Sequence, residues 1–396
     1  MKDRFASLCV KKLDLPEHNS PQQLPLVLSS SFAFETIEQG IDIFTGKDEG
    51  FVYSRYGNPT IEAVTRRLEA LEGFDLPLEL QGYMTSSGMA AIHLVLISLL
   101  KPGDQVLTQA NLYGGTTELL IKVLGEQDII PVFTDLGNLE QVEAELQNNK
   151  RIRALYMETP TNPTLTCLDI EGLTRLAADK GIKTIVDNTF STPYLQQPFR
   201  YGVDFVIHST TKYLNGHGTG IAGVVIGRDT PFMKERFWPV LKLTGATCNP
   251  FDAWLVGNGI RTLPLRMERH NTNAMALAKA LSDHDQVERV NYPGLEDHSS
   301  HALASRQMTG FGGMLSFQVR GGQSEALQVM NRLKLASLAP TLGDVDTLVL
   351  HPATSSHLKV AADIREAQGI TEGLIRVSVG LEGTDDLVQD FVQALG

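Results

Sequence analysis

Between residues 59 and 250, short apolar runs alternate along the chain with longer segments of helical periodicity. Short apolar runs bounded by turn residues predict buried strands, and apolar residues three or four apart predict amphipathic helices. The expected strands are 105–108, 129–133, 153–158, 184–187, 204–207 and 222–226. The expected helices are 60–72, one opened by Ser87, 115–124, 139–146 and 170–178. This alternation predicts βαβ units and an α/β fold with a mostly parallel central sheet.

The pattern changes at both ends of the chain. Residues 1–58 lack strong periodicity and are rich in Ser, Pro and Gln and then Gly, which predicts an extended arm lying on the body or on a neighbouring subunit. After Pro250 we expect one long helix, 251–281, followed by a smaller α/β domain with strands at 313–319, 333–337 and 374–379. The prediction is thus an arm (1–58), a large domain (59–250) and a C-terminal domain (251–396).

Composition narrows the class of protein. The chain has 396 residues, 42% of them hydrophobic and 20% charged, as in ordinary globular enzymes, and is long enough for more than one core. A net charge of −12 argues against nucleic acid or an anionic membrane as a partner. Cys9, Cys167 and Cys248 are far apart, which fits a reducing cytoplasm. We expect no secretory signal and no membrane span, and therefore a cytoplasmic enzyme acting on a small molecule.

The strongest chemical candidate is Lys212, which follows the apolar strand 204–207 and the hydroxyls of Ser209 and Thr211. A lysine at the end of a buried strand loses hydration, so its pKa falls and its amine can form a Schiff base. The alternative is a solvated loop lysine, as most lysines are. Asp187 ends another apolar strand. A carboxylate and an amine at strand ends, where ligands gather on such sheets, suit pyridoxal phosphate (PLP), which needs a protonated ring nitrogen and a covalent amine.

Three further features have both a functional and an ordinary interpretation. Gly88 and Met89, at the start of a helix, offer backbone N–H groups to a phosphate, or are simply the first turn after a capping Ser87. Tyr113 follows a strand and could stack on a planar ring or merely pack. Arg376 interrupts an apolar strand, and could bind a substrate carboxylate or form an internal salt bridge.

Other site types have weaker support. Tyr53 and Arg55 lie in the arm, where no core requires them, and are either functional or surface residues of a turn. His298 and His301 have no third ligand nearby, so we expect no metal site. The glycine-rich nucleotide motifs are missing, which argues against the alternative of a nucleotide-binding α/β protein without covalent chemistry.

Seven ordered blocks together resemble the PLP-dependent enzymes of Cys/Met metabolism, which have the aspartate-aminotransferase fold, also called fold type I. The blocks lie at 53–60, 87–89, 112–114, 158–163, 186–189, 208–213 and 376–382, and span nearly the whole chain. The resemblance implies a PLP enzyme that is at least a dimer and commonly a tetramer. Lys212, Asp187 and Arg376 are all intact, which makes a catalytically silent member of the fold a poor alternative.

The resemblance also implies a role for each matching residue. Lys212 would hold the cofactor covalently and move protons, Asp187 would pair with its ring nitrogen, and Tyr113 would stack on the ring and assist proton transfer. The phosphate would be bound by Gly88, Met89, Ser209 and Thr211, together with Tyr53 and Arg55 of a neighbouring subunit. The substrate carboxylate would be bound by Arg376, Asn162 and the region of Ser337.

The choice of reaction within the family depends on a few positions. Gly115 stands where methionine γ-lyases have Cys, although the segment around His351 resembles theirs, and Leu350 stands where cystathionine γ-lyases have Glu. Thr219, in place of an Asp, resembles O-acetylhomoserine sulfhydrylases, as does the segment 266–270. We therefore expect γ-replacement on an O-acylhomoserine by a sulfur nucleophile, in homocysteine or methionine synthesis. The alternatives are γ-elimination of methionine or cystathionine, and cystathionine γ-synthesis.

Overall fold

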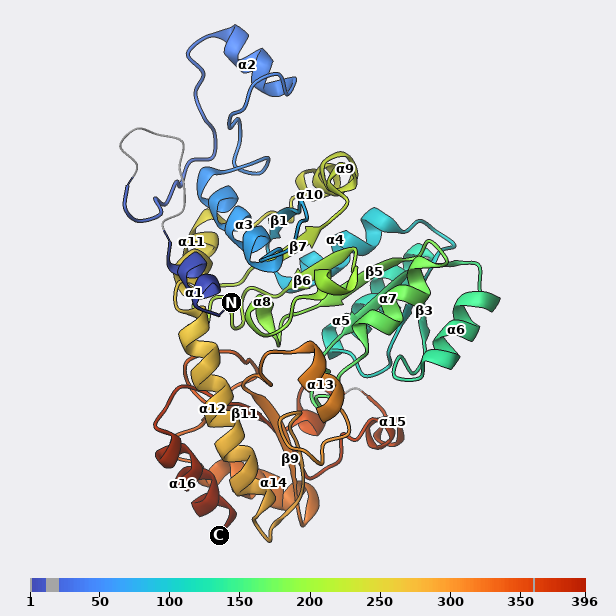
Figure 1. Cartoon of the computed structure of the whole chain (residues 1–396), viewed down its shortest axis with the longest axis vertical. Coiled ribbons are helices and arrows are strands. Elements are labelled where there is room, and N and C mark those ends of the chain that lie inside the picture. Colours follow the sequence, from blue (N-terminus) through green and yellow to red (C-terminus); the bar gives the residue numbers. More distant parts are fainter. Residues whose placement is uncertain (1, 12–20, 359) are drawn as a thin grey trace.

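The computed structural model describes residues 2–11, 21–358 and 360–396 (Figure 1). Its larger sheet has seven strands in the order β1-β7-β6-β5-β4-β2-β3. Within this sheet only β7 runs antiparallel to its neighbours. The mostly parallel α/β fold is therefore confirmed, although β1 was not predicted. The strands are β1 (Gln81–Thr85), β2 (Gln105–Thr108), β3 (Ile130–Phe133), β4 (Ile152–Glu158), β5 (Lys183–Asp187), β6 (Phe205–His208) and β7 (Gly223–Gly227).

Helices cover both faces of this sheet, and two of them show why the local sequence predicted them. In α3 (Pro59–Glu72), the Asn58 side chain accepts a hydrogen bond from the Thr60 N–H and Gly73 ends the helix. In α4 (Gly88–Leu99), Ser87 caps the Ala90 N–H. The others are α5 (Gly114–Glu118), η1 (Leu119–Leu124), η2 (Gly125–Gln127), α6 (Leu139–Asn148), α7 (Ile170–Ala178), α8 (Thr192–Leu195), η3 (Pro198–Tyr201), α9 (Thr230–Phe232), η4 (Met233–Phe237) and α10 (Trp238–Thr244).

The central strands are buried on both sides, so alternate residues enter two different cores. Tyr156 and Ile185 pack with α4 in one cluster, whereas Leu155 and Val186 join the cluster on the opposite face. Because side chains alternate along a strand, continuous apolar runs are required for such a two-sided sheet. This arrangement leaves the strand ends as the place for polar chemistry.

A second sheet follows, with the strand order β10-β11-β12-β9-β8. Its strands are β8 (Val287–Asn291), β9 (Met314–Val319), β10 (Ser337–Leu338), β11 (Leu348–Leu350) and β12 (Leu374–Ser378). The helices of this half are α11 (Pro250–Ile260), α12 (Leu263–Ser282), α13 (His301–Gln307), α14 (Gly322–Arg332), η5 (Pro352–Thr354), α15 (Ala362–Ala367) and α16 (Thr384–Leu395). The expected strands at 313–319 and 374–379 are therefore present within a residue or so.

Two predictions for this half are wrong. The single helix 251–281 is two helices, because Pro264 lacks an N–H and fits only the first turn of a new helix, α12. The strand 333–337 is reduced to Ser337–Leu338. The carboxylate of Asp390 in α16 accepts the backbone N–H groups of residues 334, 335 and 336, which removes them from any ladder.

The N-terminal arm is more structured than its sequence suggested. It contains α1 (Lys2–Val10), which packs against α3 and α12, and α2 (Ile37–Phe44), which stands away from the rest of the chain (Figure 1). Residues 1 and 12–20 of the predicted arm lie outside the described residues. No helix in the described part of the chain is long and apolar enough to cross a membrane.

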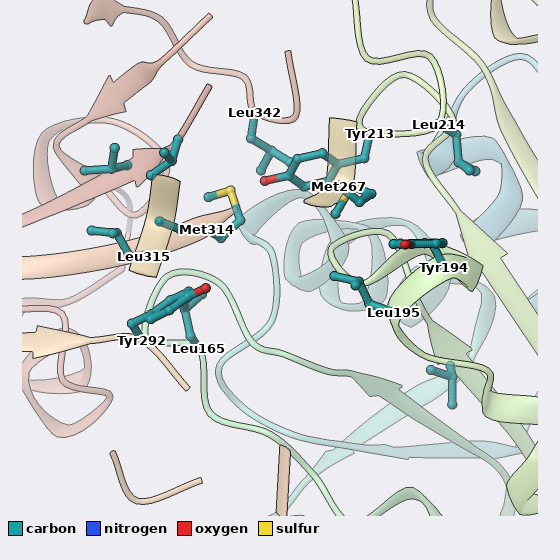
Figure 2. Packing of buried hydrophobic residues seen from close by; sticks show 14 of the residues in the cluster. Leu165, Tyr194, Leu195, Tyr213, Leu214, Met267, Tyr292, Met314, Leu315 and Leu342 are labelled. Atoms are coloured by element: carbon teal, nitrogen blue, oxygen red, sulfur yellow. The ribbon is translucent and has the colours of Figure 1, made fainter. Parts of the chain in front are cut away.

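One hydrophobic core extends from the large sheet to the small one. Tyr213, which follows Lys212, belongs to the same cluster as Met267, Met314 and Leu342. Figure 2 shows Leu342 directed toward the ring of Tyr213, with Met314 nearby. The backbone around Lys212 is therefore held between residues from both halves of the chain.

Candidate active site

The carboxyl ends of three neighbouring strands supply one wall of a cavity of about 250 Å³. Glu158 ends β4, Asp187 ends β5, and β6 leads into Ser209 and Lys212. The second sheet contributes Arg376 from β12. The cavity is lined by Ser87, Gly88, Met89, Ile92, Tyr113, Glu158, Pro160, Asn162, Asp187, Thr189, Phe190, Ser209, Thr211, Lys212, Ile221, Pro340, Thr341, Leu342 and Arg376.

Lys212 is held at the boundary between the two sheets. Its Nζ donates a hydrogen bond to Thr341 Oγ1 at 2.8 Å. Burial, together with the nearby charge of Arg376, lowers the pKa of Lys212 to about 8, and Asp344 partly opposes this effect. An amine that gives up its proton this readily can act as a nucleophile and as a base. Thr341 was not predicted. It lies in the Thr-Leu-Gly-Asp loop just before β11, and the turn residues of that loop are the only feature of the sequence that could have drawn attention to it.

Asp187 is partly buried and has donors on both oxygens. Its Oδ1 accepts the Thr189 N–H at 3.0 Å and its Oδ2 accepts the Tyr156 hydroxyl at 3.4 Å. Burial raises the pKa of Asp187, whereas hydrogen bonds from Thr189 and the charge of His208 oppose that rise. A carboxylate in this setting would gain from a cationic partner inside the cavity.

The start of α4 forms a cradle suited to an anion. Ser87 caps the Ala90 N–H, whereas Gly88 and Met89 begin the helix, where backbone N–H groups have no acceptor within the helix, and both line the cavity. A Cβ on Gly88 would lie 2.6 Å from Cβ of Ser209, so only glycine fits this close approach. Ser209 and Thr211 also line the cavity and can supply hydroxyls.

Arg376 is 4% exposed, and its described contacts are with neutral oxygens. One guanidinium nitrogen donates to the Thr341 carbonyl at 3.0 Å, and another donates to Asn162 Oδ1 at 3.4 Å. Among the described residues no carboxylate forms a salt bridge with it, and its buried Nε has no hydrogen-bond partner. Burial lowers the pKa of Arg376 to about 10. A buried guanidinium without an anion is well suited to a ligand carboxylate.

Tyr113 forms part of the cavity wall and is 45% exposed. Its N–H donates to Glu158 Oε2 at 2.9 Å. A Cβ on Gly115 would lie 2.6 Å from Cε1 of Tyr113 and 3.3 Å from Sδ of Met89. Gly115 therefore provides the space in which the tyrosine ring lies.

Three residues named from the sequence do not line this cavity. Ser337 is exposed on β10, where its N–H donates to the Thr347 carbonyl, and the same segment presents Thr341 to the cavity instead. Arg55 donates to the Lys242 carbonyl at 2.6 Å, and its guanidinium lies 5.6 Å from the ring of Tyr53. A role for Tyr53 and Arg55 in a neighbouring subunit stays a prediction.

The arrangement fits PLP. Gly88 leaves room for a phosphate at a helix start, Asp187 can pair with a protonated ring nitrogen, and Lys212 offers an amine of lowered pKa. The fold and the cavity together define a fold type I PLP enzyme. In the described residues no group of three or more His, Cys, Asp or Glu side chains could hold a metal ion.

Comparison with known proteins places the chain in a family. The model of the family described as "Cys/Met metabolism PLP-dependent enzyme" matches residues 7–396, and this chain belongs to that family. It is 43% identical to an L-methionine gamma-lyase of Fusobacterium nucleatum subsp. polymorphum, covering 94% of this chain and 93% of that protein. It is 41% identical to an O-succinylhomoserine sulfhydrylase of Pseudomonas aeruginosa, covering 93% and 90%.

Solved structures agree with this assignment. The crystal structure of cystathionine gamma synthase from Xanthomonas oryzae pv. oryzae matches with a TM-score of 0.91 and 36% identity, covering 99% of this chain and 97% of that chain. The chain is therefore a PLP-dependent enzyme of sulfur amino acid metabolism. Within the family, the comparisons support the γ-lyase alternative better than the expected O-acylhomoserine sulfhydrylase.

Proposed function

We propose that this enzyme catalyses γ-elimination of methionine, giving methanethiol, 2-oxobutanoate and ammonia with the consumption of one water. Two observations support it: the methionine γ-lyase relatives, and the charges that line the cavity. Lys212 and Arg376 are the only cationic side chains among the described lining residues. One is used for the cofactor and the other for the substrate carboxylate, so no cation is left for a second carboxylate.

The charge count distinguishes between substrates. Cystathionine and O-succinylhomoserine each carry a second carboxylate at the far end, whereas the methylthio group of methionine is uncharged. The lining of the cavity includes the apolar side chains of Phe190, Ile221 and Leu342. An apolar wall favours a small uncharged substituent over a charged one that would have to be desolvated.

Each residue has a defined task in this proposal. Arg376, oriented by the Asn162 amide, binds the substrate carboxylate and so fixes the α-carbon near Lys212. PLP, when bound, draws electrons from the α-carbon and makes removal of its proton feasible. The Lys212 amine then takes the proton from Cα and moves protons to and from neighbouring carbons as the thiolate leaves Cγ. Thr341 accepts a hydrogen bond from that amine and keeps it in place.

γ-Replacement on O-acetylhomoserine is the second candidate, because that substrate also lacks a second carboxylate. The observation in its favour is Thr219, whose hydroxyl pairs with the Asn215 side chain at 3.2 Å instead of presenting a carboxylate to the turn. The first candidate remains the one that the relatives favour.

One experiment separates these reactions. The purified holoenzyme is given methionine alone, cystathionine alone, or O-acetylhomoserine with sulfide, with Lys212→Ala as the control. Rapid release of 2-oxobutanoate and methanethiol from methionine supports the proposal. Homocysteine from O-acetylhomoserine and sulfide, with little 2-oxobutanoate from methionine, replaces it with the sulfhydrylase function. Preferential cleavage of cystathionine contradicts the charge argument.

We further propose that the enzyme works as a homo-oligomer in a reducing compartment such as the cytoplasm. Tyr53 and Arg55 lie outside their own chain's cavity, as expected if they complete the site of a neighbour. The three cysteines are buried and free, which suits a compartment where disulfides do not form.

A further inference from the structure

Glu158 is a buried carboxyl group that the proposed reaction does not use. It is 6% exposed, ends β4 and lines the cavity. In the parallel pairing of β4 with β5 it stands directly opposite Asp187. Two carboxyl groups therefore end adjacent strands at the cavity wall, and two negative charges so close together in a buried place are strongly unfavourable.

The two carboxyl groups have different partners. Asp187 accepts a side-chain hydroxyl and a backbone N–H, and His208 lies close enough to favour its charge. Glu158 accepts the backbone N–H of Tyr113 at 2.9 Å and a backbone hydrogen bond from Asn162. The groups that lower the pKa of Glu158 are backbone N–H donors, whereas those that lower the pKa of Asp187 also include the side chains of Thr189, His208 and Tyr156.

The groups around the two carboxyls also favour a proton on Glu158 and the negative charge on Asp187. Burial, followed by the charge of Asp187, raises the pKa of Glu158 from 4.5 to about 8. Burial also raises the pKa of Asp187, but its donors and His208 counteract the rise. The titratable or charged groups around Glu158 are Asp187 on β5, Tyr156 on its own strand, Tyr113 before α5, and Lys212 and Arg376, which line the same cavity.

We propose that Glu158 is a positioning residue that stays protonated at neutral pH, leaves the single negative charge of the pair on Asp187, and fixes the main chain of Tyr113. This inference rests on the PLP site but not on which sulfur compound is the substrate. A neutral Glu158 matters for Lys212, because a second anion in the cavity would favour the protonated amine and so remove the base. It also gives the ring nitrogen of the cofactor one defined carboxylate partner, Asp187.

The first test measures the proton on Glu158 without using activity. Apo-protein is unfolded with urea between about pH 5 and about pH 8 for wild type, Glu158→Gln and the exposed control Glu140→Gln. The unfolded carboxyl ionises near its ordinary pKa, whereas the folded one keeps its proton, so folded wild type binds more protons in this window. Its stability must therefore fall relative to Glu158→Gln as pH rises, by about tenfold in the unfolding equilibrium per pH unit.

Glu140→Gln should instead follow wild type throughout. A constant difference between wild type and Glu158→Gln across the same window would overturn the protonated state. Infrared difference spectra of the holoenzyme give a second readout: a protonated carboxylic acid band at neutral pH that is absent in Glu158→Gln and present in Glu140→Gln. A band that persists in Glu158→Gln as well as in Glu140→Gln would also contradict the proposal.

The positioning of Tyr113 is tested with Glu158→Gln against Glu158→Leu. Glutamine keeps a carbonyl oxygen for the Tyr113 N–H, whereas leucine removes the acceptor. The visible circular dichroism of the bound cofactor should be retained in Glu158→Gln and weakened several-fold in Glu158→Leu. Equal circular dichroism spectra of Glu158→Gln and Glu158→Leu would show that Glu158 does not position Tyr113. A colourless wild type would instead refute the cofactor site, while the unfolding experiment on apo-protein would still decide the protonation state.

Discussion

Lys212 Nζ donates a hydrogen bond to Thr341 Oγ1 across 2.8 Å, and this contact joins the large sheet to the loop before β11. The same loop packs tightly on the lysine backbone: a Cβ on Gly343 would lie 2.7 Å from the Tyr213 nitrogen. Gly343 has a φ of +82°, a conformation that glycine adopts without strain. The second half of the chain thus determines where the reactive amine lies.

Removing the Thr341 hydroxyl should therefore impair proton transfer more than substrate binding. We expect Thr341→Ala to lower kcat up to about tenfold, the worth of one hydrogen bond, with a smaller change in KM. Thr341→Ser keeps the hydroxyl and should recover most of the loss. Steady-state kinetics with methionine measure both values. An effect confined to KM would show that Thr341 contacts substrate and does not hold the lysine.

The lowered pKa of Lys212 predicts a specific dependence of stability on pH. Because its pKa falls from 10.5 to about 8 on folding, the unfolded chain binds more protons between those values. Wild-type apo-protein should therefore gain stability relative to Lys212→Met as pH rises from about 8 to about 10.5, by on the order of 3 kcal/mol. Urea unfolding at several pH values tests this, with the exposed Lys180→Met as the control. A difference that does not change with pH would show that the amine is solvated.

Arg376 should determine affinity for the substrate carboxylate. We expect Arg376→Ala to lower kcat/KM by about 10- to 100-fold, mainly through KM, because charge-assisted hydrogen bonds are lost. Arg376→Lys should restore little, since an ammonium cannot reproduce the planar fork of the guanidinium. Methioninamide, which lacks the carboxylate, serves as the control substrate, and wild type and variants should treat it alike. A selective loss with methioninamide would contradict this role.

Gly115 should be required for the position of the Tyr113 ring. A Cβ at this position would lie 2.6 Å from Tyr113 Cε1, so Gly115→Ala and Gly115→Cys must both displace the ring. We expect both to lower kcat by about tenfold to a hundredfold, as small misplacements at reacting centres do. Gly125→Ala, where the nearest atom is 3.6 Å away, is the matched control. Higher methionine cleavage in Gly115→Cys than in Gly115→Ala would show that the thiol itself contributes.

The parts of the fold that could be predicted are those with local causes. The caps Asn58 and Ser87 satisfy N–H groups of their own helices, so the beginnings of α3 and α4 were readable from the sequence. The strand predicted at 333–337 failed because Asp390, distant in sequence, takes those backbone N–H groups. Nothing local in the segment indicates that competition.

The site could be predicted where a charged residue lies in or beside an apolar strand. Arg376 interrupts such a strand, Asp187 ends one and Lys212 closely follows one, and the structure brings the three together in one cavity. Thr341 was missed because a hydroxyl in a loop gives no such signal. Glu158 was located at a strand end but without a role, because its importance depends on the neighbour opposite it across the sheet. Which residue stands opposite another across a sheet depends on the tertiary structure and cannot be read from the local sequence.

The final prediction concerns the neighbouring subunit. If Arg55 completes the site of a partner, each active site takes Lys212 from one chain and Arg55 from the other. Arg55→Ala and Lys212→Ala then remove residues that different chains contribute to one site. Each variant alone should be nearly inactive, but mixed dimers contain one intact site, with Lys212 from one chain and Arg55 from the other. Random mixing by joint refolding should therefore restore about a quarter of wild-type activity. Mixed oligomers, verified by tags of different mass, that stay inactive would show that Arg55 serves its own chain, where it already donates to the Lys242 carbonyl.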